Sequence, residues 1–125
     1  MATIDVLVTD QGVAARPNPV GADRGELVVW NFRPSSQTFR VVFKEFQPPN
    51  GPKERISGQR PFSQSLSTDP GPVGGIIDLG AQAGRYIYDI QDAEGKKLNW
   101  LNHLPPDQNF GGLYVPKPPV RSGGG

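Results

Sequence analysis

The chain has 125 residues and no cysteine, and its 13 Lys and Arg nearly balance its 12 Asp and Glu, which leaves a formal charge of +1. Its 16 glycines and 14 prolines are about twice the usual share, which excludes a helical bundle or coiled coil because both residues disrupt helix interiors. Without cysteine there is no disulfide, thiolate metal ligand or thiol nucleophile, and the near-zero charge disfavours binding to nucleic acid or to an anionic membrane.

The first half of the chain predicts three strands. Residues 4–8 and 26–32 alternate in a way that is typical of strands with one buried face. The strongest strand spans residues 37–46, where Phe39 and Phe43 share one face and polar side chains occupy much of the other. Gly, Pro, Asn and Asp fill the intervening segments, which we expect to be turns and loops.

The second half begins with a long proline-rich loop over residues 47–61. A loop of this length in a compact domain is often functional. Turn-forming residues predict a tight turn at 92–95, and residues 96–104 fit either a strand or a short helical turn. The remaining expected strands are residues 73–79, 84–91 and 111–115, with an additional edge strand within 61–67.

These elements predict one all-β domain over residues 1–115. Seven or eight short strands separated by turns, without a convincing long helix, favour a two-sheet β-sandwich with Greek-key connections. We expect two stacked antiparallel sheets around a single core. The Pro- and Gly-rich residues 116–125 are expected to form a tail, whose final Ser-Gly-Gly-Gly is either native or a cloning remnant.

Four segments, taken in order, resemble the cupredoxin family. They are the strand at 27–32, the strand at 39–43, the Gly-Arg-Tyr-Ile-Tyr sequence at 84–88 and the closing Gly-Gly-Leu-Tyr-Val at 111–115. Small blue-copper proteins have a similar series of strands, so the resemblance implies a cupredoxin-like sandwich. The Gly-x-Tyr pattern also fits a tyrosine corner, in which the hydroxyl of Tyr86 bonds to nearby backbone.

The residues at the family's copper-ligand positions differ from the ligands themselves. A blue-copper centre needs two imidazoles, a thiolate and a weak axial thioether. The resemblance puts the two histidine positions near Phe39 and Ala93, the cysteine position near Ile90 and the axial methionine near Asn109. None of these side chains can replace the corresponding ligand, and the chain has no cysteine and only one histidine. We therefore expect neither a metal nor a cofactor, and copper electron transfer is excluded.

The residue inventory also argues against an enzyme. His103 is the only imidazole, and the chain has no Gly-x-Ser-x-Gly, HExxH or P-loop pattern. Asp89, Asp92 and Glu94 are close enough in sequence to form an acid–base pair or a Ca²⁺ site, but a plain polar turn is the simpler interpretation. We expect no catalytic residues.

Residues 92–110 are the segment expected to carry a binding site, because in a cupredoxin-like frame they lie where relatives hold copper. An aromatic ring among oriented polar groups is typical of a sugar or peptide contact. The alternative is that the tryptophan folds inward and fills that end of the sandwich, since large apolar side chains are usually buried. The candidate binding residues are Trp100, Asn102, His103, Asp107 and Asn109.

The function predicted from these patterns is a non-enzymatic, copper-free binding or assembly module. Its partner would be another protein or a second copy of the chain, and exposed edge strands would provide a route to self-association. The alternative is a carbohydrate-binding module that uses the 92–110 loop. We expect no nucleic-acid or membrane partner. The beginning of the chain has no features of a signal peptide, so a cytoplasmic location is expected, although a mature secreted domain whose signal has been removed would look the same.

Overall fold

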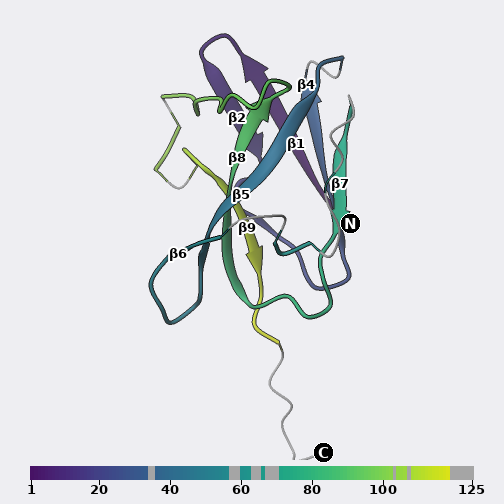
Figure 1. Cartoon of the computed structure of the whole chain (residues 1–125), viewed down its shortest axis with the longest axis vertical. Coiled ribbons are helices and arrows are strands. Elements are labelled where there is room, and N and C mark those ends of the chain that lie inside the picture. Colours follow the sequence, from purple (N-terminus) through teal and green to yellow (C-terminus); the bar gives the residue numbers. More distant parts are fainter. Residues whose placement is uncertain are drawn as a thin grey trace, which may run out of the picture.

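Two β-sheets make up the part of the chain that the computed structural model describes, namely residues 1–33, 36–56, 60–62, 66, 71–102, 104–106 and 108–118. This part is all-β, so no helix in it is long and apolar enough to span a membrane. Its strands are β1 (Ala2–Thr9), β2 (Gly12–Arg16), β3 (Val20–Gly21), β4 (Leu27–Arg33), β5 (Phe39–Gln47), β6 (Glu54–Arg55), β7 (Val73–Ile76), β8 (Gly84–Asp92) and β9 (Gly111–Val115). The first sheet has the order β2-β1-β4-β7 and the second β3-β9-β8-β5-β6 (Figure 1).

Both sheets are mixed rather than antiparallel. β1 runs parallel to β4, and β3 runs parallel to β9, while the other strand pairs are antiparallel. The expectation of two antiparallel layers is wrong at these two pairs, because side-chain alternation within a strand does not specify the direction of a distant partner. The open two-sheet arrangement is otherwise consistent with the expected β-sandwich.

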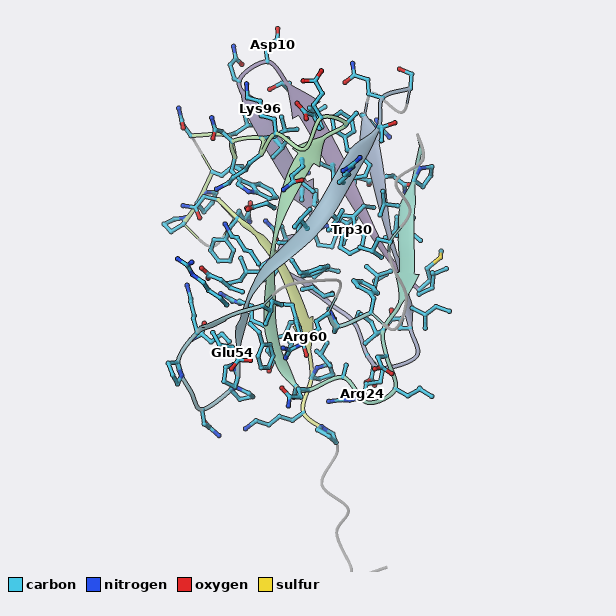
Figure 2. All side chains as sticks on the ribbon, viewed as in Figure 1. Asp10, Arg24, Trp30, Glu54, Arg60 and Lys96 are labelled. Carbon is cyan, nitrogen blue, oxygen red and sulfur yellow. The ribbon has the colours of Figure 1, made fainter. Side chains whose placement is uncertain are left out.

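The core lies between the two sheets and combines apolar side chains from both. Trp30 on β4 is fully buried and packs edge-to-face against Phe43 on β5 and Tyr88 on β8, with ring centroids 6.2 and 5.5 Å apart. Figure 2 shows Trp30 in the middle of the molecule. The buried faces expected from the alternation in the strands near 4–8, 26–32, 37–46 and 84–91 are confirmed, with Ile4, Val6, Val28, Trp30, Phe39, Val41, Phe43, Tyr86, Tyr88 and Ile90 all in the core.

A β-bulge in β5 changes which of its side chains are buried. The pairing with β8 shifts register between Phe43 and Glu45, so Lys44 is the extra residue. Strict alternation would place Phe46 on the face opposite Phe43, but both rings are buried. An extra residue reverses the alternation beyond it, and Phe46 therefore returns to the core.

Three short strands lie in segments expected to be turns or loops. β2 folds back on β1 as a hairpin, and the two-residue strands β3 and β6 pair with β9 and β5. Where an edge strand was expected, Phe62 forms a single bridge with Ile77, and residues 63–65 and 67 lie outside the described residues. Residues 119–125 of the expected tail also lie outside them.

The tyrosine corner expected at Tyr86 is confirmed by its geometry. The Tyr86 hydroxyl donates a 2.7 Å hydrogen bond to the carbonyl of Gln82, four residues earlier in the chain. The Tyr86 ring packs against Phe46, with centroids 4.6 Å apart. The bond fixes the turn that leads into β8, because it ties the first residues of the strand to the preceding loop.

Two tyrosines of β8 should respond differently to removal of the hydroxyl. We expect Tyr86→Phe to lower the free energy of unfolding by about 1 kcal/mol, because it deletes a hydrogen bond. Tyr88→Phe should leave stability at neutral pH unchanged or raise it, since the buried Tyr88 hydroxyl has no hydrogen-bond partner within the described residues. Urea denaturation of both variants measures the difference, and equal losses would contradict the assignment of the corner to Tyr86.

Stability should also fall at high pH because of the same two residues. Burial raises the pKa of Tyr88 to about 12, with the nearby Trp30 indole opposing it, and burial raises the pKa of Tyr86 against the opposing charge of Arg60. Between pH 10 and 12 the unfolded chain therefore loses a proton from Tyr88 that the folded chain keeps. The contribution of Tyr88 to the free energy of unfolding is therefore complete below about pH 10. As the pH rises to about 12 this contribution is lost, and the loss is on the order of 2–3 kcal/mol. Urea denaturation at a series of alkaline pH values should show this loss, and Tyr88→Phe should reduce it.

Candidate functional site

The segment between β8 and β9 leaves the second sheet, contacts the edge of the first and returns to the second. It starts with the expected turn, in which the Asp92 carboxylate accepts hydrogen bonds of 2.9 Å from the backbone N–H groups of Glu94 and Lys96. It then pairs with β8, where the Leu98 N–H donates to the carbonyl of Ile90 at 2.9 Å. In Figure 1 this yellow-green segment runs over the ends of the strands before it enters β9.

The same segment then pairs with the edge of β2. The Val13 N–H donates to the carbonyl of Asn99 at 2.8 Å, and the Leu101 N–H donates to the carbonyl of Val13 at 3.0 Å. The Leu104 N–H donates to the carbonyl of Leu101 at 3.3 Å, but residues 96–101 form neither the strand nor the helical turn that the sequence allowed over 96–104. They are an extended bridge between the two sheets, because Leu98 pairs with one sheet and Trp100 with the other.

Trp100 is buried where this bridge meets β2. Only 9% of it is exposed, and its ring meets Tyr88 edge-on with centroids 6.3 Å apart. Its indole N–H has no hydrogen-bond partner within the described residues. The interpretation that Trp100 fills the end of the sandwich is the one that this burial supports, since an inward-facing ring is not a flat platform for a sugar.

Polar side chains nevertheless gather around a hollow of about 450 Å³ outside Trp100. Three predicted site residues lie together there, namely Trp100, Asn102 and Asn109, whereas His103 and Asp107 lie outside the described residues. The other polar residues of the hollow were not predicted from the sequence. Gln11 belongs to the unexpected β1–β2 hairpin, and Lys97 and Asn99 were expected in a strand or helical turn. A hairpin signal was available in the two residues between Thr9 and Gly12. Among the described residues, the lining consists of Gln11, Lys97, Asn99, Trp100, Leu101, Asn102, Leu104 and Asn109.

A buried asparagine that the sequence did not single out holds the far end of this segment. Asn18 is 7% exposed, and its amide donates a 2.7 Å hydrogen bond to the carbonyl of Phe110. Its side-chain oxygen accepts a 3.0 Å hydrogen bond from the N–H of Gly112. Because Asn18 satisfies groups on both sides of Gly111, it fixes where the segment enters β9.

The acidic residues near the turn are engaged in structural contacts. The Asp89 carboxylate lies 2.9 Å from the Lys44 ammonium and 3.9 Å from that of Lys97, so two cations surround it. Asp92 accepts two backbone hydrogen bonds, as described above. These contacts support the interpretation of a polar turn over an acid–base pair, and the described residues contain no group of three or more His, Cys, Asp or Glu suited to a metal ion.

The positions that the cupredoxin resemblance would assign to copper ligands do not fit copper in this protein. Phe39 and Ile90 are buried apolar side chains, and Phe39 packs against Phe32 with ring centroids 5.1 Å apart. Asn109 is an exposed amide. None of these groups offers the imidazole or thiolate that the metal requires.

A second surface exposes large apolar side chains at one corner of the first sheet. Leu27 and Ile76 lie opposite each other on β4 and β7, with 39% and 55% of each exposed. Leu79 is 78% exposed and lies against Gly25, and Met1 is brought beside Leu27 by the pairing of β1 with β4. We call these four residues, Met1, Leu27, Ile76 and Leu79, the apolar corner.

The chain matches no protein-family model and no curated protein. A function for this protein therefore has to be inferred from its surfaces.

Proposed function

We propose that this protein is a non-enzymatic, copper-free cupredoxin-like module with Greek-key connections, which acts in binding or assembly. The order of its four family-like segments and the Tyr86 corner support the cupredoxin-like part of the proposal. The chain has no cysteine and a single histidine, and the buried apolar residues Phe39 and Ile90 stand at two of the four ligand positions that the resemblance implies. Such a scaffold is available for a function carried by its surface.

The apolar corner is the observation that carries the assembly function. Isolated exposed apolar residues are ordinary, but a contiguous group marks an interaction site. Leu27 and Ile76 are directly opposed across two strands, and β7 is the last strand in its sheet. Covering each of these side chains in an interface would contribute up to about 1.5–3 kcal/mol, because each leaves water for an apolar contact. A second copy of the chain is the partner that we propose.

Sedimentation equilibrium from micromolar to millimolar concentration tests this proposal. We expect the wild-type protein to associate reversibly and Ile76→Lys with Leu79→Lys to remain monomeric, because a charge would be buried at the contact. Tyr114→Lys is the matched control, since Tyr114 is 43% exposed but lies on β9 of the other sheet. A wild-type protein that stays monomeric over the whole range, or a corner variant that associates as well as the control, would overturn self-association.

The amide-lined hollow favours carbohydrate as a second candidate ligand. Asn99, Asn102 and Asn109 each present both donors and acceptors, which match the hydroxyl groups of a sugar. Trp100 underlies these amides, so its fluorescence would respond to a bound oligosaccharide. Titration with glucans, chitin oligomers and anionic sugars should change the emission and should fail to do so in Asn102→Ala. No change with any of the three sugar classes would remove this candidate.

A further inference from the structure

The outer face of the first sheet carries an unusual set of neighbours at the end remote from the apolar corner. Asp5 on β1 lies beside Arg16 on β2, and two residues further along β1, Leu7 lies between Ala14 and Arg33. The side chains of Asp5 and Leu7 point to the same outward face because alternate residues of a strand share a face. Arg33 is six residues from Leu27 along β4, or roughly 20 Å, so this region is separate from the apolar corner.

These residues line two neighbouring hollows that together extend across three strands. One hollow of about 420 Å³ reaches from Arg33 over Leu7 to Leu104 and Gln108, which stand beside β2. A second hollow of about 280 Å³ shares Asp5 and Arg33 with the first and continues towards Pro72. We call the two hollows together the trough. It crosses β4, β1 and β2, which spans roughly 10 Å between the outer strands, and its size suits an extended chain of a few residues.

The charged groups in the trough have no ionic partners in the part of the chain that the structure describes. No ion pair there involves Asp5, Arg16 or Arg33, although Lys44 and Asp89 pair closely on the other sheet. Two guanidinium groups against one carboxylate give the trough a net positive charge. Between them Leu7 is 50% exposed, so an apolar surface lies within reach of both cations. This pattern complements a ligand that combines carboxylates with an apolar side chain.

The edge of β2 adds main-chain groups at one end of the trough. Val13 directs its N–H and carbonyl away from β1, towards Asn99 and Leu101. Because these directions alternate along a strand, the N–H and carbonyl of Ala15 point to the same side. They have no backbone partner within the described residues, and Ala15 lines the trough. The end of a peptide lying in the trough could therefore hydrogen-bond to the edge of β2 at Ala15.

We propose that the trough binds an extended acidic peptide segment of another protein. One apolar side chain of the peptide rests on Leu7, and its carboxylates bind Arg16 and Arg33. Backbone groups at one end of the peptide hydrogen-bond to Ala15 at the edge of β2. Binding is electrostatically assisted, so it weakens as salt is raised.

Fluorescence anisotropy with a labelled hexapeptide, Gly-Glu-Leu-Asp-Leu-Gly, tests the proposal at protein concentrations below any self-association. We expect binding that weakens roughly tenfold when Arg16→Gln and Arg33→Gln are combined, because two charge-assisted contacts are lost. Asp5→Asn should instead tighten binding about two- to fivefold, because it removes the one repelling carboxylate. Arg40→Gln is the matched control, since Arg40 is an exposed arginine on the outer face of the second sheet and should have no effect.

Three further measurements test the charge dependence and the location of the binding site. A peptide with Gln and Asn in place of Glu and Asp should bind at least several-fold more weakly, and the acidic peptide should shift the amide resonances of Ala15 and Leu104. In the free protein the Ala15 N–H should exchange with solvent faster than the Val13 N–H, which is hydrogen-bonded. No binding at millimolar peptide, equal effects of Arg40→Gln and the paired variant, or an Ala15 N–H as protected as that of Val13 would overturn the proposal. None of these outcomes depends on the apolar corner.

Discussion

Replacing Trp100 with alanine is expected to lower the free energy of unfolding by about 3–5 kcal/mol. The ring is 9% exposed and contacts Tyr88, so its loss would leave a cavity where residues 99–101 join the two sheets. Trp100→Phe should retain much of the stability that Trp100→Ala loses. The indole N–H that the phenylalanine lacks has no hydrogen-bond partner within the described residues. Urea denaturation followed by circular dichroism measures both changes.

Asn102→Ala is the matched control for Trp100, since Asn102 is an exposed neighbour that lines the same hollow. Its stability should remain within about 0.5 kcal/mol of wild type. If Trp100 were instead a binding platform on an open loop, Trp100→Ala would cost less than about 1 kcal/mol and would alter only ligand binding. That result would reverse the interpretation that Trp100 closes the sandwich.

A single methyl group at Gly111 should have the second large effect. Gly111 on β9 lies opposite Tyr88, and a Cβ at this position would overlap the Tyr88 ring. That ring cannot move aside freely, because Trp30 and Phe43 both pack against it, each with its ring centroid 5.5 Å from that of Tyr88. We expect Gly111→Ala to lower the free energy of unfolding by about 1–3 kcal/mol or more through overpacking.

Gly21→Ala provides the comparison for Gly111→Ala. Gly21 lies on β3, and no atom lies within 4 Å of the position that its Cβ would take. This variant should match wild type within about 0.5 kcal/mol in thermal or urea denaturation. Equal stability of the two variants would show that the Tyr88 ring accommodates the methyl group and that the aromatic cluster is less tightly packed than its distances indicate.

The assembly and peptide-binding proposals use opposite ends of one sheet face. Leu27 and Ile76 mark one end, and Arg16 and Arg33 mark the other. A second copy at the apolar corner and a peptide in the trough could therefore bind together. Charge substitutions at one end should leave binding at the other unchanged, because effects of well-separated residues usually add.

The candidate site was predictable only in part. The segment 92–110 was identified from its aromatic and polar residues, and three of its five named residues lie around one hollow. The contribution of Gln11 was not predictable from that segment, because it comes from a hairpin about ninety residues away in sequence. Neither Asn18 nor the trough has a local signature, since each depends on residues from strands that are distant along the chain.

The sequence by itself determined the longer strands and the turn after β8. Period-two alternation predicted the buried faces near Ile4, Trp30 and Tyr88, and Asp92 predicted its own turn, because these patterns depend on neighbouring residues and backbone geometry. Only the tertiary structure decided the two parallel strand pairs, the bulge at Lys44 and the bridge of residues 96–101 between the sheets. Each of these depends on which distant backbone satisfies a strand's hydrogen bonds and on how rings such as Trp100 fill the remaining core, which no short stretch of sequence encodes.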